Sequence, residues 1–154
     1  MAKSLQEGDK APDFSMPSTD GTIQLKDFKG SYLVLYFYPK DDTPGCTTEA
    51  KDFTSLAAEF AKRNAKIVGV SRDPMAKHEK FAAKHELDVI LASDESGETT
   101  ESYGTWVEKN MYGKRYMGVA RATFLIDPSG TIIKSWKKVR VKGHAEAVLE
   151  ELPA

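Results

Sequence analysis

The sequence has few of the features that commit a chain to disulfides, membranes or nucleic acid. Cys46 is the only cysteine among 154 residues, so no internal disulfide framework is available. The longest strongly apolar run, Tyr32 to Tyr38, is far shorter than the roughly 20 residues that span a bilayer. Acidic and basic residues number 23 and 22, so the chain has no excess of positive charge that would attract nucleic acid or anionic lipid. We therefore expect no nucleic-acid partner and no membrane association.

Other absences bear on location and organisation. The first ten residues, M-A-K-S-L-Q-E-G-D-K, lack the apolar core of a signal peptide, and the lone cysteine suits a reducing compartment. We therefore expect a cytoplasmic location. There is no internal repeat or linker-like stretch, and the apolar and charged fractions of 40% and 29% are ordinary for a globular protein. The length predicts one domain over residues 1–154.

Apolar periodicity and turn residues predict the elements along the chain. A short hairpin is expected within residues 12–25, around Thr19-Asp20-Gly21. Asp73 and Pro74 are expected as N-cap and first residue of a helix that runs to about His85. The turn D-P-S-G should join the last two strands as a hairpin. The predicted strands are 32–38, 66–71, 89–92, 120–126 and 131–136, and the other predicted helices are 44–63, 97–103 and 144–152.

The order of these elements indicates the fold class. Without the N-terminal hairpin and the residues between 103 and 120, the order is β-α-β-α-β-β-α. The first two strands should pair in parallel, and the final hairpin adds an antiparallel pair. The result is an α/β fold of the thioredoxin-like type, with a mixed central sheet, helices on both faces and an N-terminal hairpin.

A free cysteine is most often an inert, packed residue, but the context of Cys46 favours reactivity. Thr43 suits the N-cap and Pro44 the first helical position, which places Cys46 in the first turn of a helix. There the unpaired N–H groups and the helix dipole favour a thiolate. A helix terminus contributes only about 0.3 to 1 kcal/mol, and Asp41 and Asp42 act against it. A reactive Cys46 therefore requires a positive side chain from elsewhere.

Two positive residues are candidates for this role. Lys40 is close in sequence, in a loop where solvation is the simpler expectation. Arg121 enters an apolar strand, where a guanidinium should be paired; a purely structural salt bridge remains the alternative. Glu49 lies one helical turn after Cys46 and could orient Arg121 against the sulfur.

The stretch Y-F-Y-P-K-D-D-T-P-G-C-T-T-E carries the pattern Pro39-x-x-x-Thr43-x-x-Cys46. This pattern resembles the active-site motif of peroxiredoxins, specifically the bacterioferritin comigratory protein or peroxiredoxin Q group. The resemblance extends over nearly the whole chain through G-D-K-A-P-D-F, G-V-S-R-D, E-K-N-M-Y-G-K and R-x-T-F-L-I-D. It implies an antioxidant oxidoreductase of cell redox homeostasis, which reduces hydrogen peroxide and organic hydroperoxides at the expense of thiols.

The resemblance also implies roles for individual residues. Cys46 would attack the peroxide O–O bond and become a sulfenic acid. The Thr43 hydroxyl and the Cys46 backbone N–H would hold the peroxide, Arg121 would polarise it and stabilise the thiolate, and Pro39 would shield the sulfur from water. No metal, haem or flavin is required, so we expect no cofactor, and the group suggests a monomer.

One departure from the group's pattern concerns the second cysteine. Many members carry a resolving cysteine five residues after the first or on the next helix, where this chain has Lys51 and Ala82. The protein is either a one-cysteine enzyme or a variant in which Ala82 replaces a cysteine. In both cases an external thiol must resolve the sulfenic acid: thioredoxin, glutaredoxin or a small thiol.

Other functions fit the sequence less well. T-P-G-C resembles the C-x-x-C site of a thioredoxin-type disulfide oxidoreductase, but dithiol exchange needs two cysteines. A catalytically silent thioredoxin-like interaction module would leave Cys46 merely packed. The spacing between His78 and His85 is too wide for two ligands of one metal, with His144 far along the chain. The basic stretch from Lys134 to His144 is better explained as a solvated strand and turn than as a nucleic-acid site.

Overall fold

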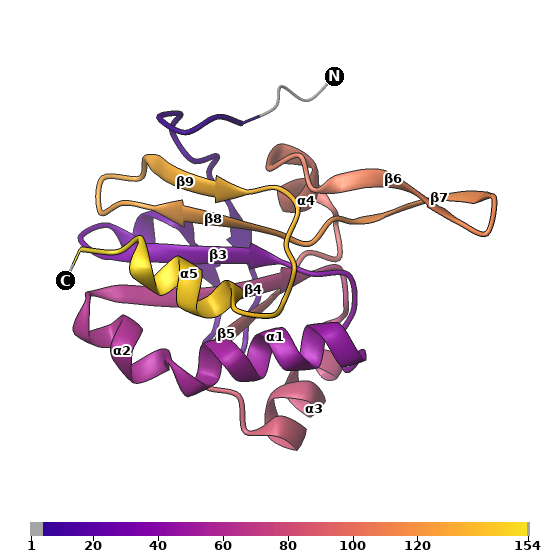
Figure 1. The fold of residues 1–154 in the computed structure, drawn as a ribbon, viewed down its shortest axis with the longest axis horizontal. Helices are drawn as coiled ribbons and strands as arrows, with labels where there is room; N and C mark the ends of the chain where they lie inside the picture. The colour runs from indigo at the N-terminus through magenta and orange to yellow at the C-terminus, as the bar shows by residue number, and fades with distance from the viewer. Residues whose placement is uncertain (1–4, 154) are drawn as a thin grey trace.

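The computed structural model describes residues 5–153, which are organised around one five-stranded sheet (Figure 1). The strand order is β5-β4-β3-β8-β9. β3 pairs in parallel with β4, and β4 with β5, whereas β8 is antiparallel to both β3 and β9. The mixed sheet predicted from the sequence is confirmed. The bounds of its strands are β3 Tyr32–Phe37, β4 Ala65–Ser71, β5 Ile90–Ser93, β8 Ala122–Ile126 and β9 Ile132–Trp136.

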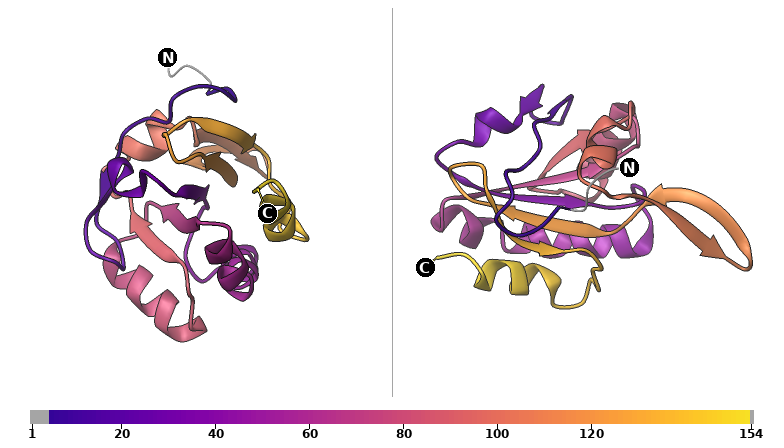
Figure 2. Two further views of the ribbon diagram at one scale, coloured as in Figure 1. Left: turned by 90° about the vertical axis from the view of Figure 1, so that its left-hand side faces the viewer. Right: turned by 90° about the horizontal axis from the view of Figure 1, so that it is seen from above.

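Alternating side chains of β3 and the residue after it divide the core into two clusters, one on each face of the sheet. Figure 2 shows the sheet with elements packed on both of its faces. Leu33, Leu35 and Phe37 face the smaller elements, and Val34, Tyr36 and Tyr38 face the longer helices. Helices therefore lie on both faces, as expected. The smaller elements are β1 Ser15–Met16, β2 Ile23–Gln24, the 3-10 helix η1 Leu25–Phe28 and α4 Glu98–Ser102; the longer helices are α1 Pro44–Ser55, α2 Ala57–Lys62, α3 Met75–His85 and α5 His144–Glu150.

The helix predicted over residues 44–63 is interrupted at Leu56, which corrects the sequence-based prediction. Leu56 has φ −103° and ψ 3°, and its N–H bonds to the carbonyls of Phe53 and Thr54 instead of the residue four before it. The Ser55 hydroxyl donates to the carbonyl of Asp52, the kind of local bond that competes with a regular helix. α1 and α2 are consequently two helices that share a junction.

The start of α3 is a second correction. The helix begins at Met75, with Pro74 as its N-cap, so neither Asp73 nor Pro74 takes the position predicted for it. The Asp73 carboxylate instead accepts hydrogen bonds from the backbone N–H of Asp41 and the hydroxyl of Ser71. This link to a loop distant in sequence outweighs local capping. The other predicted elements agree with the structure to within two residues, and the N-terminal hairpin pairs Ser15 with Gln24 and Met16 with Ile23.

A hairpin that the sequence analysis did not assign projects from the body of the molecule (Figures 1 and 2). It consists of β6 (Trp106–Met111) and β7 (Lys114–Val119). Its turn, Tyr112-Gly113, has φ of 53° and 81°, the positive values that a two-residue hairpin turn requires. The residues N-M-Y-G-K hold the signal for this turn, although Tyr takes the place usually filled by Asn or Asp.

Close packing across the sheet holds α1 in place. Tyr36 on β3 stacks on Phe53 of α1, with ring centroids 4.8 Å apart. On the neighbouring strand, Gly69 leaves room for the Tyr36 ring, because a Cβ at position 69 would lie 2.6 Å from a ring carbon. The catalytic candidate at the start of α1 therefore rests on a rigid aromatic support. Among the described residues, no helix is long and apolar enough to cross a membrane.

Candidate active site

The first turn of α1 positions Cys46 as the sequence predicts. Thr43 is the N-cap residue, with an extended backbone, and Pro44 is the first residue of the helix. The first intrahelical bond runs from the N–H of Thr47 to the carbonyl of Thr43, so the N–H of Cys46 precedes the helical ladder. The Cys46 side chain is only 2% exposed. The sulfur thus sits in a dry environment beside a backbone donor and the positive end of a helix.

Arg121 links this sulfur to a buried carboxylate. Its Nη2 lies 3.4 Å from Cys46 Sγ, and its Nη1 donates a 2.7 Å hydrogen bond to Glu49 Oε1. Of the two positive candidates, Arg121 is therefore the one that reaches the sulfur, whereas Lys40 is exposed. The planar guanidinium serves both partners because its donors point in fixed directions.

Burial and charge oppose each other at Glu49. Desolvation raises its pKa to about 7, although Arg121 acts to lower it. The carboxyl group is 1% exposed, and its Oε2 has no hydrogen-bond partner among residues 5–153. Burial alone would lower the pKa of Arg121, but Cys46 and Glu49 raise it above its ordinary value. Arg121 is therefore always charged, while Glu49 changes its protonation state near neutral pH.

Gly45 makes room for the guanidinium. A Cβ at this position would lie 3.1 Å from Arg121 Nη2, closer than an ordinary contact. The small residue between Pro44 and Cys46 therefore permits Arg121 to approach the helix terminus. This requirement comes from a contact between distant parts of the chain, so the local sequence pattern does not reveal it.

The Thr43 hydroxyl does not cap α1. It donates a 2.9 Å hydrogen bond to the carbonyl of Lys40, which leaves its oxygen lone pairs as acceptors. An acceptor oriented in this way suits the O–H of a hydroperoxide. Pro39 lies half-buried in the same loop, between β3 and α1.

A buried polar network that sequence reasoning missed anchors this loop to α3. His78 approaches Asp41 Oδ2 at 2.6 Å through Nδ1 and the carbonyl of Ala92 at 2.9 Å through Nε2. The ring thereby uses both nitrogens in hydrogen bonds within the protein, one to a carboxylate and one to a backbone carbonyl. The Tyr38 hydroxyl also donates to Asp41. The Asp41 carboxylate, expected to oppose the thiolate, therefore has partners in both His78 and Tyr38.

The remaining histidines also have partners in the protein. His85 and Lys84 on α3 contact Asp42 at 2.9 and 2.8 Å, and their hydrogen bonds lower the pKa of this carboxyl. His144 lies 2.8 Å from the hydroxyl of Thr123 through Nε2. Among residues 5–153, no three His, Cys, Asp or Glu side chains gather closely enough to hold a metal ion.

The two positions considered for a second cysteine lie in different surroundings. Lys51 is exposed on α1, and Ala82 is half-buried on α3 against the same apolar cluster that contains Cys46. Neither position supplies a thiol.

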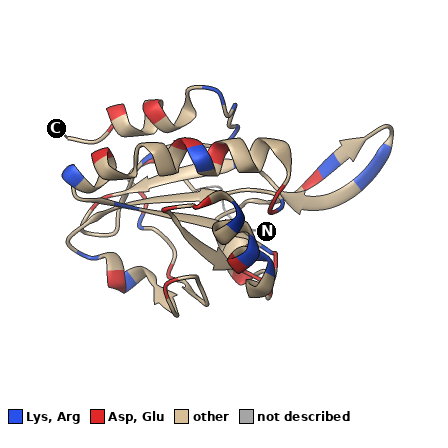
Figure 3. Ribbon diagram, turned by 90° about the horizontal axis from the view of Figure 1, so that it is seen from below, with Lys and Arg blue, Asp and Glu red and all other residues tan. Residues whose placement is uncertain are grey.

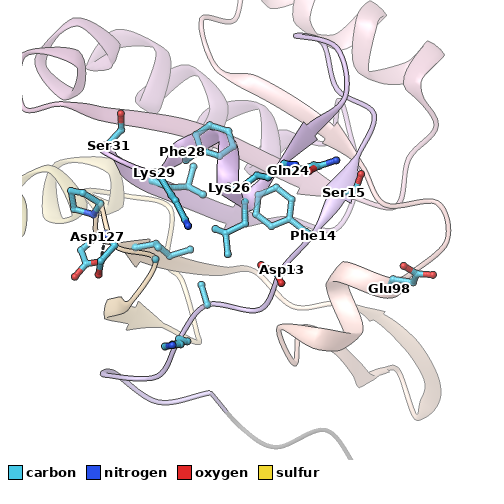
Figure 4. Close-up of a pocket in the computed structure, with 18 residues that line it drawn as sticks. Asp13, Phe14, Ser15, Gln24, Lys26, Phe28, Lys29, Ser31, Glu98 and Asp127 are labelled. Carbon is cyan, nitrogen blue, oxygen red and sulfur yellow. Dashed lines mark hydrogen bonds between the residues drawn. The ribbon is translucent and has the colours of Figure 1, made fainter.

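A cavity of about 780 Å³ lies elsewhere, between the N-terminal segment, η1 and the turn after β8 (Figure 4). Phe14, Phe28 and Leu33 contribute its apolar wall, and all three belong to the cluster on the opposite face from Cys46. Lysine and acidic side chains line it together. This cavity is therefore remote from the Cys46 sulfur, and the candidate site is defined by the Cys46 contacts instead.

The sequence matches the profile of the AhpC/TSA family over residues 7–135. It is 48% identical over 149 residues to "Peroxiredoxin Bcp" of Bacillus subtilis, covering 96% of this chain and 95% of the relative. It is 40% identical over 149 residues to "Peroxiredoxin Bcp" of Escherichia coli, covering 96% of each chain.

Solved structures agree with these sequence relatives. Xanthomonas campestris peroxiredoxin Q has a TM-score of 0.85 at 46% identity, with 89% of this chain and 87% of that chain covered. A cysteine-to-serine mutant of Xylella fastidiosa PrxQ has a TM-score of 0.91 at 36% identity, with 97% and 96% covered. The chain is therefore similar to these proteins in both sequence and fold.

Proposed function

This chain belongs to the AhpC/TSA family as a peroxiredoxin of the Bcp and Q type, a thiol-dependent peroxidase, and we propose that Cys46 is its peroxide-reducing residue. The observation that carries the proposal is the position of Arg121, whose guanidinium contacts both Cys46 Sγ and Glu49. A permanent positive charge beside a thiol stabilises the thiolate, the form that attacks peroxides.

In the oxidative step, the Cys46 thiolate attacks one oxygen of the hydroperoxide. The S–O bond forms as the O–O bond breaks, giving a sulfenic acid, and the leaving hydroxide or alkoxide takes up a proton from solvent and departs as water or an alcohol. In this step, the Cys46 N–H and Arg121 stabilise the negative charge that builds up on the peroxide oxygens. The Thr43 hydroxyl, which donates to the Lys40 carbonyl, accepts from the peroxide O–H and aligns it.

In the proposed assignment, Pro39 and Glu49 assist without touching the transferred oxygen. Pro39 is half-buried in the loop before α1, where its ring would limit the access of water to the sulfur. Glu49 acts as a positioning residue through its 2.7 Å hydrogen bond with Arg121.

The reductive step needs a thiol from another molecule, because Cys46 is the only cysteine in the sequence. An incoming thiolate attacks the sulfenic sulfur, forms a mixed disulfide and releases hydroxide, which is protonated to water. A second thiol then attacks the mixed disulfide, releasing Cys46 as a thiolate and carrying away the oxidising equivalents as a disulfide. Without a thiol supply, excess peroxide drives the sulfenic acid to sulfinic and sulfonic acids.

Hydrogen peroxide and organic hydroperoxides are the proposed substrates. One solved relative, the Xanthomonas campestris bacterioferritin comigratory protein, is described as having alkyl peroxide reduction activity. Thioredoxin, glutaredoxin or a small thiol would serve as reductant. Dependence on external thiols suits a cytoplasmic enzyme of redox homeostasis. A monomer of one domain, without nucleic-acid or membrane partners, stays our prediction.

Rapid mixing with hydrogen peroxide tests the assignment. The wild-type protein should consume one equivalent of peroxide much faster than free cysteine does, with one added oxygen at Cys46 by mass spectrometry. Cys46→Ser should abolish both signals. A Cys46 that reacts no faster than free cysteine would favour the silent interaction module, and disulfide exchange without peroxide reduction would favour an oxidoreductase of the thioredoxin type.

A further inference from the structure

Large apolar side chains are exposed on the β6–β7 hairpin, which projects beside the active site (Figure 2). Met111, Tyr112, Tyr116 and Met117 have exposed fractions of 56, 99, 43 and 49%. β7 ends two residues before Arg121, so the base of the hairpin leads directly into the site. Exposed apolar groups gathered on one projecting element are typical of a surface that contacts a partner.

The strand register divides the hairpin into two faces. Lys109 is paired with Tyr116, and Met111 with Lys114, so these four side chains lie on one face. The intervening pairs, which include Met117 and Arg115, lie on the other face. We call the first set the arm face; it consists of Lys109, Met111, Lys114 and Tyr116.

The arm face is continuous with the surroundings of Cys46. The Lys109 stem lies across Gly118 towards the base of the hairpin, with its Cδ 3.2 Å from where a Gly118 Cβ would be. Burial and the charge of Arg121 lower the pKa of Lys109, while Cys46 acts to raise it. The Lys109 ammonium is therefore near enough to experience both active-site charges.

Basic residues also lie on a second side of the site, on the loop that precedes α5, which carries Lys138, Arg140 and Lys142. Lys142 lines a cavity of about 540 Å³ beside Pro44 and Gly45, and the acidic residues Asp52 and Glu146 line the same cavity, so charge of both signs is present there. Figure 3 shows basic residues on both this loop and the hairpin. The nearby acids Asp41 and Asp42 are paired with side chains of α3, as described above. Among the described residues, the unpaired basic side chains of the arm face therefore stand out, although the chain has a formal net charge of −1.

We propose that the arm face docks a protein thiol reductant whose attacking cysteine lies in an apolar surface with an acidic rim. The inference rests on the proposed function, since the docked thiol reduces the sulfenic acid of Cys46. Met111 and Tyr116 would contact the apolar surface of this partner, and Lys109 and Lys114 would contact its acidic rim. Four side chains make a patch that suits a brief redox contact better than a permanent dimer, which needs a larger area.

The test compares the two faces of the hairpin in full-length protein. Tyr116→Ser and Lys114→Glu change the arm face, while Met117→Ser and Arg115→Glu make the matched changes on the opposite face. Each variant is oxidised with one equivalent of hydrogen peroxide and then reduced by Escherichia coli thioredoxin or, separately, by dithiothreitol. Oxidation, reduction by the protein and reduction by the small thiol are thereby measured as three separate rates.

We expect thioredoxin to reduce the wild-type protein faster, per thiol, than dithiothreitol does. This rate should fall about tenfold in each arm-face variant, since 1.4 kcal/mol of lost contact is a factor of ten. It should stay within about twofold of wild type in the two opposite-face variants, and for the wild type it should fall as salt screens the charges. Reduction by dithiothreitol should keep its wild-type rate in Met117→Ser and Arg115→Glu, and should change far less than reduction by thioredoxin in the arm-face variants.

Several results would overturn the docking proposal while leaving the peroxidase intact. One is that thioredoxin reduces the oxidised wild-type protein no faster, per thiol, than dithiothreitol does. The others are that the rate of reduction by thioredoxin falls equally in the variants of both faces, or falls in none of them. A change in sedimentation of the arm-face variants would assign the hairpin to contact between copies of this chain. Loss of the oxidation step itself in wild type would instead refute the proposed function.

Discussion

The imidazole of His78 contacts the carboxylate of Asp41 at 2.6 Å, and both side chains are almost completely buried. This pair ties α3 to the loop between β3 and α1. The same loop carries Pro39 and Thr43, so the pair fixes the segment that enters the candidate active site. Its stability contribution is therefore linked to the geometry of the turn that holds Cys46.

Asp41→Asn should destabilise the protein strongly. It removes the carboxylate partner of the buried His78 ring, and breaking a buried pair of this kind typically costs about 3 to 5 kcal/mol. Urea denaturation measures the loss. Asp42→Asn is the control at the adjacent position, because Asp42 is exposed and its contacts with Lys84 and His85 are solvent-screened, so its loss should be much smaller. Equal losses from the two variants would contradict this account of the His78 network.

Arg121→Lys should slow the peroxide step by a factor on the order of 10² to 10³, the usual effect of losing an aligned charge stabiliser. A lysine ammonium cannot reproduce the two directed contacts to Cys46 and Glu49. Rapid mixing with peroxide provides the rate. Arg72→Lys is the matched control, since Arg72 is a half-buried arginine that stacks on Trp106 and donates to Thr100 and Gly97 instead of to the sulfur. A comparable slowing in the control would show that the effect is structural.

Glu49→Gln should remove an inflection near pH 7 from the profile of the peroxide rate. Desolvation raises the pKa of Glu49 to about 7, so the wild-type carboxyl ionises there, whereas glutamine stays neutral and mimics the protonated form. The variant should follow the wild-type rate on the acidic side. An unchanged inflection would show that another group causes it, and Glu59→Gln on the exposed side of α2 is the control.

The same ionisation predicts a stability effect. In the unfolded chain the carboxyl ionises near pH 4.3, and in the folded protein only near 7. The folded state therefore binds more protons in this interval, and stability falls as the pH rises from about 4.3 through 7. Glu49→Gln should flatten this decline in urea titrations at several pH values.

His144 should produce the opposite trend in acid. Burial lowers its pKa to about 4, and the charge of Arg121 contributes in the same direction. Between pH 6.5 and about 4 the unfolded chain takes up a proton that the folded state refuses, so stability falls as the pH is lowered. His144→Gln retains a hydrogen-bonding group for Thr123 and should lessen this acid dependence of the melting temperature. A melting curve with the same acid slope would remove His144 from the explanation.

The sequence predicts most of the fold because the central strands and helices carry strong periodic patterns. The run from Tyr32 to Tyr38 and the D-P-S-G turn have clear local signals, and both agree with the structure. The predicted helix bounds fail at Leu56 and Pro74. Near Leu56 a side chain bonds to neighbouring backbone, and before Pro74 the Asp73 side chain bonds to distant backbone, and these bonds decide where α1 ends and α3 begins. The β6–β7 hairpin was missed because its strands are exposed and lack a buried apolar face.

The candidate site shows a similar division. Cys46 and Thr43 are found from local spacing, and Arg121 from the improbability of an unpaired guanidinium in an apolar strand. The sequence cannot show that His78 and Asp41 meet, because 37 residues separate them and neither lies in a recognisable motif. Gly45 is equally hidden, since its role depends on a guanidinium that arrives from the residue before β8.

The packing of Tyr36 over Gly69 has an evolutionary consequence. The Tyr36 ring occupies the space that a side chain at position 69 would need, since a Cβ there would lie 2.6 Å from the ring. Substitutions at these positions should therefore show strong epistasis: alanine at 69 becomes acceptable only when a smaller residue has replaced the tyrosine at 36. An alignment of relatives should show the two positions changing together, even though they are 33 residues apart in the chain.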